Sequence, residues 1–301
     1  MEKLKYYHRE QECSDIFNRL GQVYNAATPE NHPTIFNTVE DYMAGMSILG
    51  ICAKMYSKLQ IYAFQLMSNH VHLVVSGDDD YIKEFFKYFT ERLDRYFDGK
   101  VDLSGFELNL KPVNDLAYFR NTIVYANRNG FVVCDNYTPF SYPWGTSQYF
   151  FQPMAKQYAL ISAKPATVSW LRRIMHTHDV DIIKGASIVN GYISPLDFCD
   201  IQTAEAVFRN AKQYFYSIAK NVEAYASIAK SLGESIFYTD TDLYNISVKI
   251  AKENYGAEDL VSLAARNKIE LARRLRFDYN ASDKQIQRLL RIDEEVLKAL
   301  F

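Results

Sequence analysis

Alternation and helical spacing of apolar residues divide the first half of the chain into short elements. Residues 60–67 and 70–77 have the pattern of two strands, and the Ser68-Asn69 pair between them predicts the tight turn of a hairpin. Apolar positions at helical spacing predict helices over residues 39–56 and 81–97. Residues 23–27 and 34–38 are expected to supply a first strand.

Residues 115–130 have the pattern of a further helix. We expect Asn114 or Asp115 to cap its start and Gly130 to end it. The stripe expected to face the core consists of Leu116, Phe119, Ile123 and Ala126. The resulting order, strand–helix–strand–strand–helix–strand–helix, predicts an α+β fold with a ferredoxin-like antiparallel sheet.

The second half of the chain has an almost entirely helical pattern. We therefore predict one domain over residues 1–155 and an all-α C-terminal domain over residues 156–301. Its last part, about 260–301, predicts three helices separated by short breaks, with Ser282 and Asp293 as caps. This spacing is typical of a helix-turn-helix, but a plain helical packing module remains an equal alternative.

The most informative chemistry lies in the second strand of the hairpin. Because side chains alternate along a strand, His70 and His72 are expected to share one face while Val71 points into the core. Two imidazoles side by side on a strand form half of a metal site. The alternative is a pair of ordinary histidines on a half-exposed sheet. A second His-x-His, at residues 176–178, follows a helical segment and is interpreted as a loop.

Residues 67–75, Met-Ser-Asn-His-Val-His-Leu-Val-Val, resemble the signature of HUH single-strand DNA transposases with one catalytic tyrosine. The nearest branch is that of the REP-associated (repetitive extragenic palindrome) tyrosine transposases. The resemblance implies that His70 and His72 hold a divalent cation that polarises a scissile phosphate of single-stranded DNA. It also implies a helical tyrosine that becomes linked to the 5′ phosphate.

In the family, the tyrosine is followed four residues later by an amide ligand. Tyr125 and Asn129 match that pair, so the resemblance implies Tyr125 as nucleophile and Asn129 as third metal ligand. The family's Asn-Pro pair is absent, since Gly130 follows Asn129, and Tyr125 as an ordinary buried aromatic is the alternative. Neutral ligands that leave open positions suit Mg²⁺ or Mn²⁺. The Tyr-Pro-Trp run at 142–144 also resembles a family element, or is a turn with a packed tryptophan.

Composition modifies this picture only slightly. The formal net charge of −2 predicts local basic patches instead of a basic surface overall. The sequence has no run of eighteen apolar residues, no signal peptide and no paired cysteine spacing, so we expect a cytoplasmic protein without a membrane partner. The residues considered for DNA contact are Lys83, Lys87, Arg92, Arg128, Arg273, Arg274, Lys284 and Arg288.

The sequence thus predicts a metal-dependent HUH tyrosine transposase that cleaves and rejoins single-stranded DNA near hairpin-forming repeats. The main alternative is a domesticated relative that binds and regulates DNA without cleaving it. A metal-dependent hydrolase using His70 and His72 is a third interpretation, although such an enzyme has no need of a tyrosine helix. The target sequence and the oligomeric state do not follow from the sequence.

Overall fold

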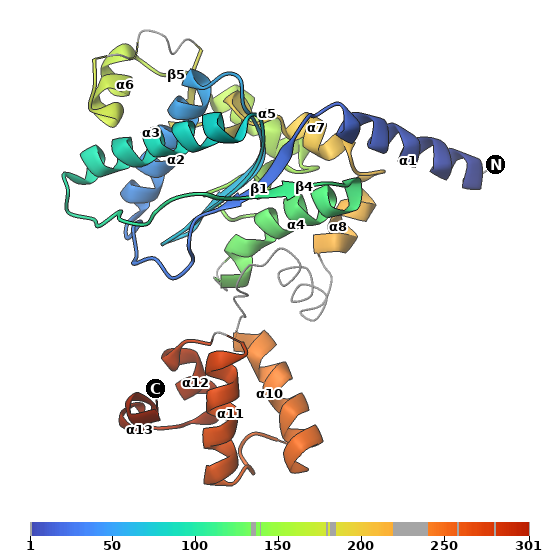
Figure 1. Ribbon diagram of the computed structural model, residues 1–301, viewed down its shortest axis with the longest axis vertical. Coiled ribbons are helices and arrows are strands. Elements are labelled where there is room, and N and C mark those ends of the chain that lie inside the picture. Colours follow the sequence, from blue (N-terminus) through green and yellow to red (C-terminus); the bar gives the residue numbers. More distant parts are fainter. Residues whose placement is uncertain are drawn as a thin grey trace. The chain divides into compact units, whose positions relative to one another are not determined.

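The computed structural model describes residues 2–133, 137–138, 140–178, 180, 185–218, 240–257, 259–279 and 281–300. Contacts divide the chain into two compact units, residues 1–130 with 137–219, and residues 131–136 with 220–301. The first unit is a mixed α+β structure with antiparallel sheets (Figure 1).

The main sheet of the first unit has four antiparallel strands in the order β2-β3-β1-β4. The strands are β1 (Val23–Ala27), β2 (Gln60–Leu66), β3 (Val71–Ser76) and β4 (Asn109–Val113). The predicted hairpin is therefore correct to within about a residue at each end. Both β2 and β3 are buried along almost their whole length, as expected for strands covered on both faces.

Helices cover the two faces of this sheet. Helices α2 (Val39–Met55) and α3 (Asp79–Phe97) lie on one face, and α4 (Leu116–Val133) lies on the other (Figure 1). Each begins at an acceptor side chain, since Thr38, Asp78 and Asp115 accept backbone N–H bonds from the first turns. The predicted helices are thus confirmed. The residues of α3 that enter the core include Ile82, Phe85, Phe86, Phe89, Leu93 and Phe97.

Three details of the first unit differ from the sequence prediction. A helix, α1 (Glu2–Asn18), precedes β1 and has little amphipathic pattern, which explains why it was not predicted. Residues 34–38 are not a strand; instead Ile35 and Phe36 donate to the carbonyl oxygen of Ser68 in the hairpin turn. Gly130 does not end α4, which continues to Val133.

Residues 137–219 also belong to the first unit, so the predicted boundary between residues 155 and 156 falls inside it. This region is not all-helical, because three short strands pair into a second sheet. Strands of two or three residues leave no readable alternation in a sequence. Its elements are α5 (Pro153–Ser162), β5 (Lys164–Pro165), α6 (Val168–Met175), β6 (Ser187–Val189), β7 (Tyr192–Ile193), α7 (Ile201–Ala206) and α8 (Ala211–Ile218).

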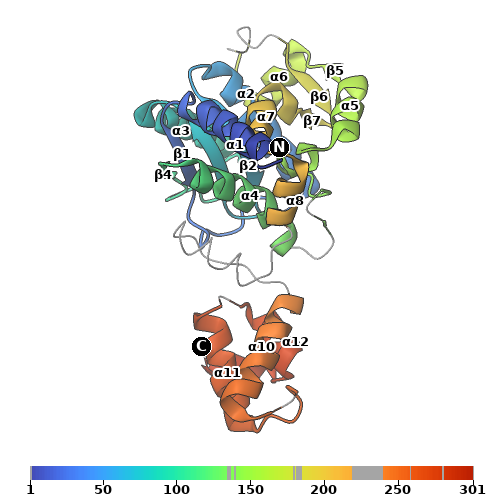
Figure 2. The same ribbon diagram turned by 90° about the vertical axis from the view of Figure 1, so that its right-hand side faces the viewer.

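The second unit contains four described helices, three of which are labelled in Figure 2. They are α10 (Asp240–Tyr255), α11 (Ala265–Phe277), α12 (Asp283–Leu290) and α13 (Glu294–Leu300). Ser282 caps α12 through a reciprocal bond pair with Gln285, as predicted, and Asp293 accepts from the N–H of Glu295. One apolar cluster joins all four helices, including Leu243, Ile250, Leu271, Leu275, Ile286, Leu290 and Leu297.

Candidate metal centre

Two histidines, one in β3 and one immediately before it, lie on one side of the sheet. His72 lies in β3, paired with Ala27 of β1 on one side and Gln65 of β2 on the other, and His70 immediately precedes the strand. Their ring centroids are 4.9 Å apart with the rings perpendicular. Both side chains are buried. The same-face geometry predicted from the alternation is therefore present.

Asn69 fixes which nitrogen of His70 faces the site. The Asn69 amide nitrogen donates to the carbonyl oxygens of Glu30 and His32, so its oxygen points the other way. That oxygen lies 2.8 Å from His70 Nδ1, which must therefore carry the proton and donate it. His70 Nε2 is left with its lone pair. A hydrogen bond at the far nitrogen is how proteins orient metal-binding histidines.

Helix α4 brings the two further predicted residues to the same point. Asn129 Nδ2 lies 2.7 Å from His72 Nε2 and 3.5 Å from His70 Nε2, so both imidazole nitrogens face this amide. The ring of Tyr125 packs edge-on against His72, with centroids 5.5 Å apart. Because Tyr125 and Asn129 are four residues apart on a helix, they project on the same side. Four residues singled out from the sequence thus converge.

The electrostatics of the site favour a neutral imidazole at His70. Burial, and secondarily the proximity of His72, hold the pKa of His70 well below its usual value. A neutral imidazole with an inward lone pair is the form that binds a metal ion. His70 Nε2 meets this requirement, His72 Nε2 lies beside the same amide, and rotating the Asn129 amide would turn its oxygen toward both nitrogens. The donor set therefore fits a divalent cation.

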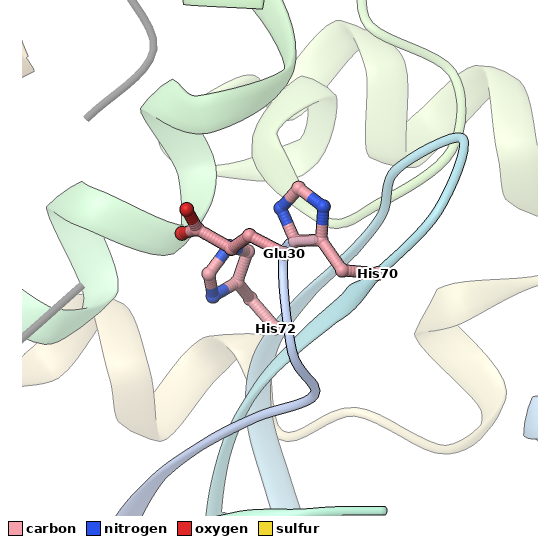
Figure 3. Close-up of side chains that lie close together, drawn as sticks. All are labelled: Glu30, His70 and His72. Atoms are coloured by element: carbon pink, nitrogen blue, oxygen red, sulfur yellow. The ribbon is translucent and has the colours of Figure 1, made fainter. Parts of the chain in front are cut away.

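A carboxylate that the sequence analysis did not select completes the group. Glu30, His70 and His72 each offer a ligand atom, and these atoms lie within 4.8 Å of one another. Figure 3 shows the three side chains gathered together, with Glu30 entering on the segment that follows β1. No spacing rule links Glu30 to the histidines forty residues later, and only the fold brings it there.

The predicted nucleophile is deeply buried. Tyr125 exposes 1% of its surface, and the predicted ligands are equally enclosed. Tyr118, seven residues earlier on α4, is only half-buried. The run at 142–144 packs beside the site: the Tyr142 hydroxyl donates to the carbonyl oxygen of Leu66, and Trp144 stacks on Tyr42. It is an ordered part of the core next to β2.

Gly130 is required by this close packing. Its N–H donates to Gln65 Oε1 at 3.0 Å. A Cβ at this position would meet the Tyr142 ring at 2.5 Å and the side-chain nitrogen of Gln65 even closer. Gly130 therefore allows α4 to approach β2 closely, so its role is packing and not helix termination.

The residues considered for DNA contact occupy different environments. Arg92 and Arg128 are buried, and the Arg92 guanidinium lies over the Tyr88 ring and donates to the Met175 carbonyl, so neither forms an exposed phosphate contact. Lys83 and Lys87 line a cavity of about 1020 Å³ between α3 and residues 99–108, which acidic side chains line as well. That cavity is not a basic patch.

In the second unit, Arg273 and Arg288 are exposed, and Arg274 lies 3.7 Å from the Asp278 carboxylate. The side chain of Lys284 lies outside the described part of the structure. His176 and His178 lie in a loop after α6, as interpreted from the sequence. Of the helices that the structure describes, none combines the length and apolar character that a membrane crossing requires.

Comparison of the chain with models of protein families, with curated proteins and with solved structures gave no match.

Proposed function

We propose that this chain is a metal-dependent enzyme that cleaves and rejoins single-stranded DNA through a 5′-phosphotyrosine on Tyr125. The observation that carries the proposal is the meeting of His70, His72, Asn129 and Tyr125 at one point. The two histidines are more than fifty positions away from Tyr125 and Asn129 in sequence. All four follow from the HUH transposase resemblance, which contains no information on their distances in this fold.

The arrangement of strands supports the same proposal. A β-α-β-β-α-β element order with strands in the sequence β2-β3-β1-β4 is what a ferredoxin-like domain would have. In this arrangement the histidine strand is interior, and the tyrosine helix covers the face toward which the histidines point. We propose that the first unit is such a domain.

The reaction is a phosphoryl transfer between two alcohols. The Tyr125 phenolic oxygen attacks phosphorus and forms a new P–O bond, while the bond to the 3′ oxygen breaks and a 3′ hydroxyl leaves with a proton. Rejoining reverses this: a 3′ hydroxyl attacks the phosphotyrosine and regenerates the phenol. His70, His72 and Asn129 would hold Mg²⁺ or Mn²⁺, which neutralises charge developing on the phosphate oxygens.

The substrate that the resemblance suggests is single-stranded DNA near a hairpin-forming repeat. We propose that the second unit is a helix-turn-helix-like module that contacts this DNA through exposed arginines such as Arg273 and Arg288. α13 begins with Glu294 and Glu295, whose negative charge disfavours contact with bases and phosphates. We therefore expect phosphate contacts by the flanking arginines to matter more than base recognition by that helix.

Burial of the tyrosine sets a condition on the proposal. With 1% of Tyr125 exposed, DNA must displace part of the covering surface before the phenol can reach a phosphate. The same observation favours the second candidate, a regulator that binds DNA through this fold without cleaving it. The two candidates differ in a single measurable product, the covalent adduct.

The test is incubation of the full chain with single-stranded hairpin DNA and Mn²⁺, followed by denaturing electrophoresis and peptide mapping. We expect an adduct at Tyr125 that Tyr125→Phe and His72→Ala abolish. Tyr118→Phe, a tyrosine on the same helix, is the matched control and should retain it. Attachment elsewhere would contradict the assignment, DNA binding without an adduct would favour the regulator, and cleavage without an adduct would favour the hydrolase.

A further inference from the structure

The candidate centre contains a carboxylate that the proposed chemistry does not use. Glu30 is partly buried, and a carboxylate oxygen lies within 4.8 Å of ligand atoms of both His70 and His72 (Figure 3). Glu30 and the two imidazoles thus bring three donor atoms together at one point, and carboxylate oxygens and imidazole nitrogens are both metal ligands.

The segment that carries Glu30 is attached to the histidine strand by several bonds. Thr28 and Val71 exchange two of them, one through each backbone N–H. Asn69 donates to the carbonyl oxygens of Glu30 and His32. Since Asn69 also accepts from His70 Nδ1, one side chain sets both the tautomer of His70 and the position of the Glu30 backbone.

We propose that Glu30 is a metal ligand, so that the centre is built on two histidines and one carboxylate, with Asn129 beside them. This inference rests on the proposed function for the presence of the ion but not for the reaction. Donors on one Mg²⁺ or Mn²⁺, at about 2.1 Å each, are at most about 4.2 Å apart. A group already within 4.8 Å needs only small side-chain adjustments to close around an ion.

The carboxylate changes which ion the centre selects. Imidazole nitrogens alone suit Zn²⁺, Cu²⁺ and Ni²⁺, whereas a carboxylate oxygen suits Mg²⁺ and Mn²⁺. It also lowers the net charge of the centre from +2 to +1, which still attracts a phosphodiester. Glu30 therefore accounts for how a histidine pair could serve a phosphoryl transfer that uses a hard cation.

The test is Mn²⁺ titration of the full chain without DNA, followed by electron paramagnetic resonance of the free ion and by calorimetry, with a parallel Zn²⁺ titration. Glu30→Gln keeps the side-chain size and should weaken Mn²⁺ binding at least about tenfold, the lower limit for losing even an outer-shell partner. Zn²⁺ binding, dominated by the imidazoles, should fall less.

The matched control is Asp80→Asn, which removes an exposed carboxylate from another cluster of acidic side chains among the described residues, Asp78-Asp79-Asp80. Its Mn²⁺ affinity should equal that of the unmodified chain. Equal Mn²⁺ affinity in Glu30→Gln and the unmodified chain would overturn the inference, as would absence of Mn²⁺ binding altogether. Thermal melting of each variant verifies that it is folded.

The inference and the proposed function can fail separately. If Mn²⁺ binding depends on Glu30 but no Tyr125 adduct forms, the inference stands and the DNA-cleaving function is refuted. If the adduct forms and Glu30→Gln binds Mn²⁺ normally while losing adduct formation, Glu30 acts as a base and not as a ligand, and the inference is wrong.

Discussion

Replacing Asn69 tests the architecture of the candidate centre without touching any proposed ligand. Asn69 makes three side-chain hydrogen bonds, donating to the carbonyl oxygens of Glu30 and His32 and accepting from His70 Nδ1. Asn69→Ala removes all three. It releases the segment that carries Glu30 and frees His70 to adopt the other tautomer, in which Nε2 carries a proton and cannot bind a metal ion.

The magnitude follows from these bonds. At about 1 kcal/mol each, three lost hydrogen bonds would cost up to about 3 kcal/mol of unfolding free energy, and less where water replaces them at this partly exposed position. For metal affinity, loss of an outer-shell partner of a histidine typically costs about 10- to 100-fold. We expect Mn²⁺ affinity to fall within that range while the chain stays folded.

The assay is Mn²⁺ calorimetry combined with urea unfolding. Asn31→Ala makes the same chemical change at an exposed neighbour on the same segment and serves as the control. Asn69→Asp keeps an acceptor for His70 Nδ1 but turns a carboxylate toward the carbonyl oxygens of Glu30 and His32. It should therefore preserve the tautomer of His70 but not the position of the segment that carries Glu30. Unchanged Mn²⁺ affinity in Asn69→Ala would refute the reasoning.

Three further predictions address packing, charge and the second unit. Gly130→Ala places a methyl group against the Tyr142 ring and should destabilise the chain by about 1–3 kcal/mol, measured by urea unfolding; an unchanged midpoint would contradict the packing role. The Arg120 guanidinium lowers the pKa of Glu10, so the stability from this α1–α4 pair is present above the unfolded-state pKa and is lost as the pH falls through the lower folded-state value. Between pH 6 and pH 3 the melting temperature of Glu10→Gln should fall less than that of the unmodified chain, and an equal fall would rule out this contribution. Removing residues 240–301 should weaken selection among hairpin DNA targets more than adduct formation, measured by competition binding; equal selectivity would reduce the module to a structural role.

The structure sets where the truncation of the second unit should begin. The sequence suggested a module beginning near residue 260, but α10 contributes Leu243, Ile250 and Ala251 to the same apolar cluster. A deletion from 260 would expose that surface and confound binding with misfolding. Local capping signals such as Ser282 were readable from the sequence, whereas the partners of an apolar stripe were not.

In the candidate centre, too, local patterns could be predicted from the sequence but long-range contacts could not. Strand periodicity was enough to place His70 and His72 on one face, and helical periodicity was enough to place Tyr125 and Asn129 together. Their meeting between the sheet and α4 required the motif resemblance, because no local rule relates β3 to α4. Glu30 was unpredictable, since it lies in an irregular segment beside Pro29 and depends on long-range bonds to Asn69. Similarly, the burial of Arg92 against Met175 depends on a residue more than eighty positions away.

The interior position of β3 has a consequence for how the centre can open. Its neighbours on both sides, β1 and β2, form continuous backbone ladders with it, and His72 has a paired residue on each. Backbone amides in such strands open only with large-scale unfolding, whereas loops and helix ends open in small local fluctuations. His72 is therefore held on a rigid strand. Under the proposed function, the opening that a DNA strand needs would come from movement of the Glu30 segment or of the residues packed over α4.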